Sequence, residues 1–230
     1  MIKSKEDYKY YLEADRMANA LPKHLNLVDK IKNIVLPNYI WQFQKTLRKL
    51  EYYKNCRKGG LSLVYKYFLF KKYKKLSLKL GFSIPVNVFG PGLSIAHPGT
   101  IVVNKGAKIG SNCRIHVCVN IGTEAGYSDK APIIGNNCYI GPGVKMYGNI
   151  SIANGTAIGA NAVVNKSFNE ENIAIAGVPA KKIADVDTLD FLIPATALID
   201  YGYYKNNELS GLTSKEIKEK IKTDKNVYKK

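Results

Sequence analysis

The chain contains three histidines, and histidine is the side chain best suited to general-base chemistry near neutral pH. With an unperturbed pKa of about 6.5, a neutral imidazole can take the proton from a hydroxyl group as that group attacks an electrophile. His24 lies among helical patterns, where a surface or hydrogen-bonded histidine is expected. His97 lies just before a periodic stretch and His116 lies within it, so these two are the candidates for a catalytic base.

The periodicity makes different predictions for the two candidates. His97 lies six residues before Val103, and strict phase would point its side chain into the interior as a buried, hydrogen-bonded histidine. The prolines and glycines around His97 make that phase uncertain. His116 directly follows Ile115, at an expected corner and about one coil from His97. It could border the same groove as a substrate-binding residue or as an alternative base.

The periodic stretch runs from Val103 to Asn165, with one interruption from Gly122 to Ile133. Four positions after the in-phase apolar residues stand small or β-branched ones, from Ala107 to Ala162, and glycine fills half of the positions directly after the in-phase residues. We expect these glycines to occupy corners with positive φ. The in-phase residues are Val103, Ile109, Ile115, Ile121, Ile134, Ile140, Met146, Ile152, Ile158 and Val164.

A period of six fits neither the 3.6-residue period of an amphipathic helix nor a hairpin at each repeat. It predicts short strands separated by tight corners, in a solenoid whose neighbouring coils cover one another. Each coil would bury the in-phase residue together with the small one. Cys113 and Cys138 take the small interior position, and the four cysteines lack the paired spacing of zinc or redox sites. We therefore expect packing roles for them and no metal.

The remaining chain suggests a three-part organisation. Helical patterns cover residues 5–19, 25–35, 38–56 and 61–80, so we expect an all-α N-terminal domain over residues 1–80, the solenoid over 81–183 and a C-terminal extension over 184–230. In the extension, the apolar stretch Phe191–Tyr204 would dock on the solenoid or on a neighbouring subunit. A capping box at Thr213 predicts a short helix to about Ile221.

Positive charge is concentrated in the N-terminal third. The chain carries a net charge of +17, and residues 1–80 hold 19 Lys and Arg against 6 Asp and Glu. Such a field favours anionic lipid, nucleic acid or pyrophosphate-linked substrates. The basic, aromatic helix expected over Leu61–Leu80 could lie on a membrane surface or pack on the other helices with its lysines extended to water. No recognition motif accompanies it, so we do not expect nucleic acid as a partner.

The sequence also bears on location. It has neither a membrane-spanning apolar run nor a signal-peptide pattern at its start. We therefore expect a cytoplasmic protein, with the inner face of the membrane as a second possible location.

The stretch from Ile84 to Ile183, with its ten in-phase repeats and the closing sequence AGVPAKKI at residues 176–183, resembles the hexapeptide-repeat acyltransferases. This resemblance implies a left-handed parallel β-helix, acetyl-CoA as co-substrate and a homotrimer, or a pair of trimers, with active sites between adjacent prisms. Within that family the chain is similar to serine acetyltransferases and to O-acetyltransferases of capsular and other surface polysaccharides. The segment Leu93–His97 looks like the one that bears their catalytic histidine.

The resemblance assigns His97 as the base and places Asn87 where serine acetyltransferases have the aspartate that pairs with it. An asparagine can orient an imidazole but cannot offset the charge of an imidazolium. A carboxylate of the interrupting loop, Glu124 or Asp129, is the alternative partner. The residues implied to contact CoA are Gly143, Val144, Lys145, Gly159, Ala160, Lys181 and Lys182.

Three departures from the serine acetyltransferase pattern concern the acceptor. Lys130 and Ala131 replace an arginine and a histidine that hold serine, and Ala96 replaces an aspartate that contacts it. We therefore expect a sugar hydroxyl of a capsular or other surface polysaccharide as the acceptor, contacted by the loop residues Glu124, Asp129 and Lys130. The alternatives are a serine O-acetyltransferase of cysteine biosynthesis and a non-catalytic trimeric scaffold that binds membrane or nucleic acid. A carbonic anhydrase of the same solenoid fold would need three histidines on one zinc, which this chain cannot supply from adjacent coils.

Overall fold

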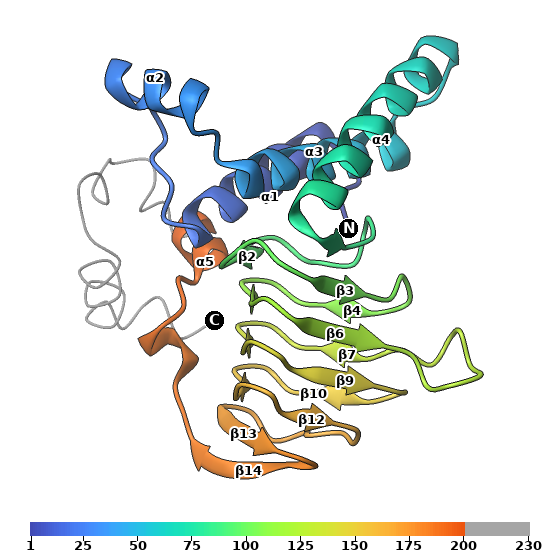
Figure 1. Ribbon diagram of the computed structural model, residues 1–230, viewed down its shortest axis with the longest axis vertical. Helices are drawn as coiled ribbons and strands as arrows, with labels where there is room; N and C mark the ends of the chain where they lie inside the picture. The colour runs from blue at the N-terminus through green and yellow to red at the C-terminus, as the bar shows by residue number, and fades with distance from the viewer. Residues whose placement is uncertain (201–230) are drawn as a thin grey trace.

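The computed structural model describes residues 1–200, which form a group of helices above a stack of short strands (Figure 1). Side chains at the helix starts explain the boundaries: Ser4, Asn26 and Asn38 each accept a hydrogen bond from the backbone N–H three residues on. The last of the four N-terminal helices ends at Gly81, whose φ of 75° closes it. These helices are α1 (Lys5–Ala18), α2 (Leu27–Val35), α3 (Tyr39–Cys56) and α4 (Gly60–Leu80).

The strands coil into a prism with three parallel sheets as its faces, a left-handed parallel β-helix as expected. Sheet A contains β1 (Phe82–Ser83), β3 (Ile101–Val103), β6 (Val119–Gly122), β9 (Lys145–Tyr147) and β12 (Val163–Val164). Sheet B contains β4 (Lys108–Ile109), β7 (Ile133–Ile134) and β10 (Ser151–Ile152). Sheet C contains β2 (Ser94–Ile95), β5 (Arg114–Ile115), β8 (Tyr139–Ile140), β11 (Ala157–Ile158), β13 (Ile173–Gly177) and the antiparallel β14 (Ala180–Asp185). The chain visits the sheets in the order A, B, C, so each coil has an A–B, a B–C and a C–A edge.

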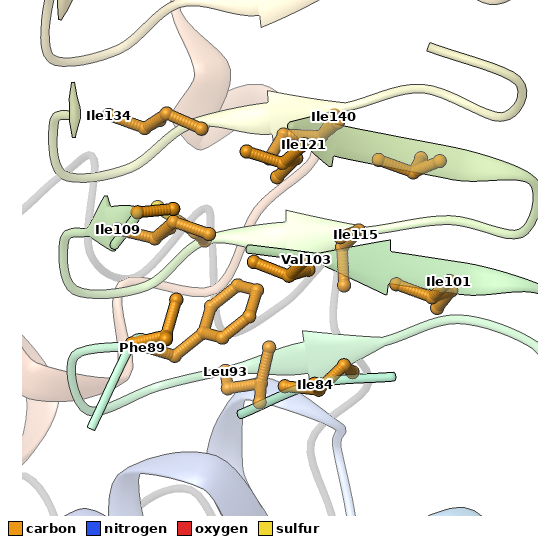
Figure 2. Close-up of a cluster of buried hydrophobic side chains, with 14 of the residues drawn as sticks. Ile84, Phe89, Leu93, Ile101, Val103, Ile109, Ile115, Ile121, Ile134 and Ile140 are labelled. Atoms are coloured by element: carbon orange, nitrogen blue, oxygen red, sulfur yellow. The ribbon is translucent and has the colours of Figure 1, made fainter. Parts of the chain in front are cut away.

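The interior confirms the six-residue pattern. Every in-phase residue from Val103 to Val164 is buried, and outside the interrupting loop so are the small or β-branched residues four positions later, from Ala107 to Ala162, Cys113 and Cys138 among them. Figure 2 shows isoleucines of successive coils stacked in layers inside the prism. Each coil therefore contributes large and small apolar side chains to one continuous core.

The glycines that follow in-phase residues have a different role from the one predicted. Gly110, Gly135 and Gly141 have ordinary negative φ, but a Cβ on any of them would lie within 2.7 Å of backbone atoms in the next coil. Close approach of coils, and not positive φ, requires glycine there. The left-handed residues stand three positions after in-phase ones at the B–C and C–A edges: Asn112, Cys118, Asn137, Gly143, Gly155 and Asn161.

A buried ionic network joins the helices to the first coil. Arg48 of α3 is fully buried and pairs with Asp15 of α1 at 2.7 Å and with Glu51 at 3.0 Å. Its guanidinium also donates to the carbonyls of Phe89 and Gly90. Burial alone would lower the pKa of Arg48, but the two carboxylates outweigh it and raise that pKa, so Arg48 stays charged. The network fixes the coil that carries His97.

The C-terminal segment returns along the B–C edge from the last coil to the helices (Figure 1). This strap, residues 186–200, includes the short helices η1 (Thr188–Asp190) and α5 (Ala195–Asp200). It hydrogen-bonds Asn172, Asn137 and Asn112 in turn, and α5 packs Ala195 and Leu198 against α1. Docking of the apolar segment on the rest of the chain is confirmed as far as residue 200. The helix predicted from Thr213 lies outside the described residues.

Helices α2 and α4 leave apolar surface uncovered. None of the α2 residues is buried, and the outer face of α4 exposes Val64, Tyr67 and Phe68 among lysines. The opposite face of α4 packs Leu69 and Tyr73 against the core. Within residues 1–200, no helix is both long and apolar enough to cross a lipid bilayer. Membrane contact and the three domain boundaries stay predictions.

Candidate functional site

The C–A edge of the prism collects most of the predicted site residues. Sheet register aligns Ile95, Ile115, Ile140 and Ile158, so the residues that directly follow them stack in a column along this edge. Backbone hydrogen bonds between neighbouring coils hold the column, such as the one of 3.2 Å from the His116 N–H to the Ile140 carbonyl. The predicted residues found on this edge are His97, His116, Gly143, Val144, Lys145, Gly159 and Ala160.

His97 is exposed and does not point into the interior. The reason is an irregular corner: five residues connect Ile95 to Ile101 in the first coil, whereas three connect Ile115 to Val119 in the second. The two additional residues shift His97 out of phase with Val103. Its ring centroid lies 6.2 Å from that of His116, so the two candidates do border one another.

His116 is half-buried and held as a neutral side chain. Burial, which contributes most, together with the positive charge of Arg114 and the neighbouring His97 lowers its pKa to about 4. The Nε of Arg114 donates a hydrogen bond of 3.4 Å to Nε2 of His116. Because Nε2 of His116 already accepts this hydrogen bond, His97 is better placed than His116 to act as the base.

Asn87 lies at a different edge, between sheets A and B, so within one chain it does not lie beside His97. Its side-chain amide exchanges two hydrogen bonds with Asn55 of α3, and its backbone N–H donates to Glu51. With φ at 65°, Asn87 forms the corner that connects the first coil to α3. In this position Asn87 connects the first coil to the N-terminal helices through its hydrogen bonds to α3.

The interrupting loop also leaves the prism at the A–B edge, between β6 and β7 (Figure 1). Lys130 forms an ion pair of 3.2 Å with Glu124 and lies 3.5 Å from the ring centre of Tyr127, while Asp129 is exposed. Ala131, at the loop's end, is buried. Within one chain these loop residues and His97 therefore occupy different edges.

The predicted CoA contacts follow the C–A edge downward from the histidines. The Gly143 N–H donates to the Val117 carbonyl, and the Lys145 ammonium to that of Cys118. Val144 is fully buried, which leaves only its backbone for a ligand. Lys181 is exposed on β14 opposite Ala176, the next residue of the column. Lys182 differs because Glu170 and Asp185 both pair with it, at 2.5 and 2.8 Å.

A cavity of about 300 Å³ lies beside this edge, on the outer face of sheet C. Its walls come from the end of α1, from Trp41 of α3, from Arg114 of β5 and from Phe191 of the strap. Sequence reasoning missed it because helices and strap close it, and both are distant in sequence. The sequence did contain one indication of the cavity. The residue before each in-phase position faces outward, and Arg114 holds that position, two residues before His116. In residues 1–200, no cluster of three His, Cys, Asp or Glu side chains could hold a metal ion.

Residues 131–166 match the family described as bacterial transferase hexapeptide (six repeats). The chain is 32% identical over 106 residues to the serine acetyltransferase of Buchnera aphidicola subsp. Acyrthosiphon pisum, which covers 45% of this chain and 38% of that protein. The Escherichia coli K12 serine acetyltransferase is 34% identical over 105 residues, with 45% and 38% covered. The aligned part thus spans about two fifths of the curated relatives it matches.

Solved structures extend the similarity to the helices. The serine acetyltransferase of Brucella abortus superposes with a TM-score of 0.61 at 27% identity over 79% of this chain and 71% of that one. Its complex with coenzyme A gives 0.61 and 27%, with 79% and 70% covered. The Neisseria gonorrhoeae serine acetyltransferase gives 0.60 and 26%, with 79% and 68% covered.

These relatives correct the expected acceptor. The departures at Ala96, Lys130 and Ala131 favoured a polysaccharide hydroxyl, but the relatives and structures that resemble the chain are serine acetyltransferases, so that prediction is wrong. The departures show only that these positions differ, and not that the acceptor does. The resemblance to the hexapeptide-repeat acyltransferases, and among them to serine acetyltransferases, is confirmed.

Proposed function

We propose that this protein transfers an acetyl group from acetyl-CoA to the side-chain hydroxyl of serine. The observation that carries the proposal is the C–A edge, where the exposed His97 and the predicted CoA contacts of two later corners lie along one line. The similar proteins named above are serine acetyltransferases, one of them solved with coenzyme A. This similarity favours an enzyme over the non-catalytic scaffold.

In the proposed reaction His97 removes the proton from the serine hydroxyl as its oxygen attacks the thioester carbon. A backbone N–H stabilises the oxyanion that forms. The intermediate then collapses, the carbon–sulfur bond breaks, and the imidazolium returns its proton to the departing thiolate. O-acetylserine and free CoA result. Because His116 stays neutral at pH 7, it does not oppose the positive charge that His97 gains during the reaction.

We further propose that the protein acts as a homotrimer. The loop of residues 122–132 and His97 lie at different edges of one prism, so a loop that contributes to catalysis must come from a neighbouring subunit. Packing three prisms side by side would set the A–B edge of one chain against the C–A edge of the next. Glu124, Asp129 and Lys130 would then approach the acceptor of the neighbour.

Thiol release from acetyl-CoA with L-serine tests the function. We expect serine-dependent release that falls by about 10²–10⁴ in kcat in His97→Ala, because a general base contributes this range. His24→Ala is the matched control and should retain wild-type rates, since His24 precedes α2 and lies far along the chain from the edge. Wild-type activity in His97→Ala, or no release with serine, would contradict the proposal.

A further inference from the structure

We propose that Arg114 binds the carboxylate of the acceptor amino acid, in the cavity between sheet C, the N-terminal helices and the strap. The inference rests on the proposed function and adds a specificity-determining residue to it. It starts from the composition of the cavity wall. Among the lining residues within positions 1–200, Arg114 alone carries a full charge, and the others are apolar, such as Trp41 and Leu192, or neutral and polar, such as Asn19 and Gln44.

Arg114 is also a cation that the described part of the chain leaves without a carboxylate. Its Nε–H donates a hydrogen bond to His116, a neutral group, and no ion pair within residues 1–200 involves it. Arg48, the other arginine close to the first coil, pairs with two carboxylates. A half-buried guanidinium beside a cavity therefore retains N–H donors for an anion from outside the chain.

The polar groups of the wall are arranged so that they do not compete for this anion. Gln44 donates to the Leu93 carbonyl, and Asn19 donates to the same carbonyl and to Gln44. On the loop, Lys130 is engaged by Glu124. In the described part of the chain, Arg114 is thus the cation that contacts His116, and its planar fork matches a carboxylate with two parallel hydrogen bonds.

Position connects the cavity to the chemistry. Ala96 lines it and precedes His97 directly, and Arg114 contacts His116, whose ring neighbours that of His97. An amino acid held at Arg114 by its carboxylate would extend its side chain past His116 toward His97. A volume of about 300 Å³ suits a small amino acid and lies at the lower end of ligand pockets, far below the need of a whole CoA molecule.

The test compares L-serine with L-serinamide, which keeps the hydroxyl and the amino group but lacks the carboxylate. We expect Arg114→Gln to raise the KM for serine by about 10- to 100-fold, as loss of a charge-assisted pair does. The KM for acetyl-CoA and the use of serinamide should change little. Arg114→Lys should recover part of the loss, because it restores the charge without the fork.

Lys108→Gln is the matched control, since Lys108 holds the same outward position on sheet B and its loss should leave serine KM unchanged. Thermal unfolding of each variant verifies folding. An equal loss with serine and serinamide, or a rise confined to the KM for acetyl-CoA, would overturn the role of Arg114 while leaving the proposed function intact. If the wild type shows no turnover of serine, the proposed function fails. Calorimetry with L-serine alone then tests whether the cavity binds the amino acid, and absence of binding would overturn the proposed role of Arg114.

Discussion

At the scale of single residues, the candidate site depends on keeping one of two adjacent histidines uncharged. The 6.2 Å between the rings of His97 and His116 would place two positive charges close together if both were protonated. Burial and Arg114 prevent this at His116. In the proposed reaction the proton of the serine hydroxyl is therefore taken by His97, the exposed member of the pair.

The depressed pKa of His116 predicts a pH-dependent stability. The unfolded chain binds a proton at this residue near pH 6.5 and the folded chain only near pH 4. The contribution of His116 to the free energy of unfolding is therefore fully present above about pH 6.5 and is lost as the pH falls toward 4. NMR titration of the imidazole should give a midpoint near 4. His116→Gln should lose less stability than the wild type across that interval, and a midpoint near 6.5 would contradict the prediction.

The residues also show what the sequence could and could not reveal. His97 was identifiable from its surroundings, but its direction was not, because two additional corner residues shift the phase. The partner predicted for it, Asn87, exchanges hydrogen bonds with Asn55 of α3 within one chain, a contact between segments distant in sequence. Arg114 carried a usable signal in its outward position. Its importance follows only from the cavity, which tertiary packing creates.

At the scale of elements, the coils are spaced by direct backbone contact at their glycines. This spacing predicts that two glycines in the same repeat position respond differently to alanine. In Gly141→Ala the new Cβ would lie 2.6 Å from the Ile158 carbonyl oxygen, so a coil must shift at a cost of about 1–3 kcal/mol. In Gly122→Ala the nearest atom lies at an ordinary 3.5 Å, and the change should stay within about 0.5 kcal/mol.

Urea unfolding of both glycine variants measures the difference. Equal free energies of unfolding would show that the coils tolerate a Cβ at this position. The elements themselves were largely predictable, because the six-residue period is local and repeats in each coil. The reason for the glycines was not predictable. In the sequence, a glycine needed for close approach of the next coil looks the same as a glycine needed for a positive φ.

At the scale of the whole molecule, the separation of the loop from His97 predicts that sites are shared between subunits. A His97→Ala chain and a chain lacking residues 126–129 should each be inactive alone. Mixed at equal amounts and reassembled, they should recover about one quarter of wild-type activity, the share of interfaces that pair an intact histidine with an intact loop. Thiol release measures the recovery. A mixture that stays inactive would place the whole site within one chain.

The strap has a consequence for how the molecule comes apart. A solenoid in which each coil touches only its neighbours tends to fray from its free end. Here the strap leaves the last coil, bonds to Asn137 and Asn112 on its way, and packs Leu198 against α1 at the opposite end. Loosening the final coil therefore also loosens the support of the first. Because the strap couples its two ends, the solenoid is expected to unfold as one cooperative unit, so the edge that carries the histidines is as stable as the whole fold.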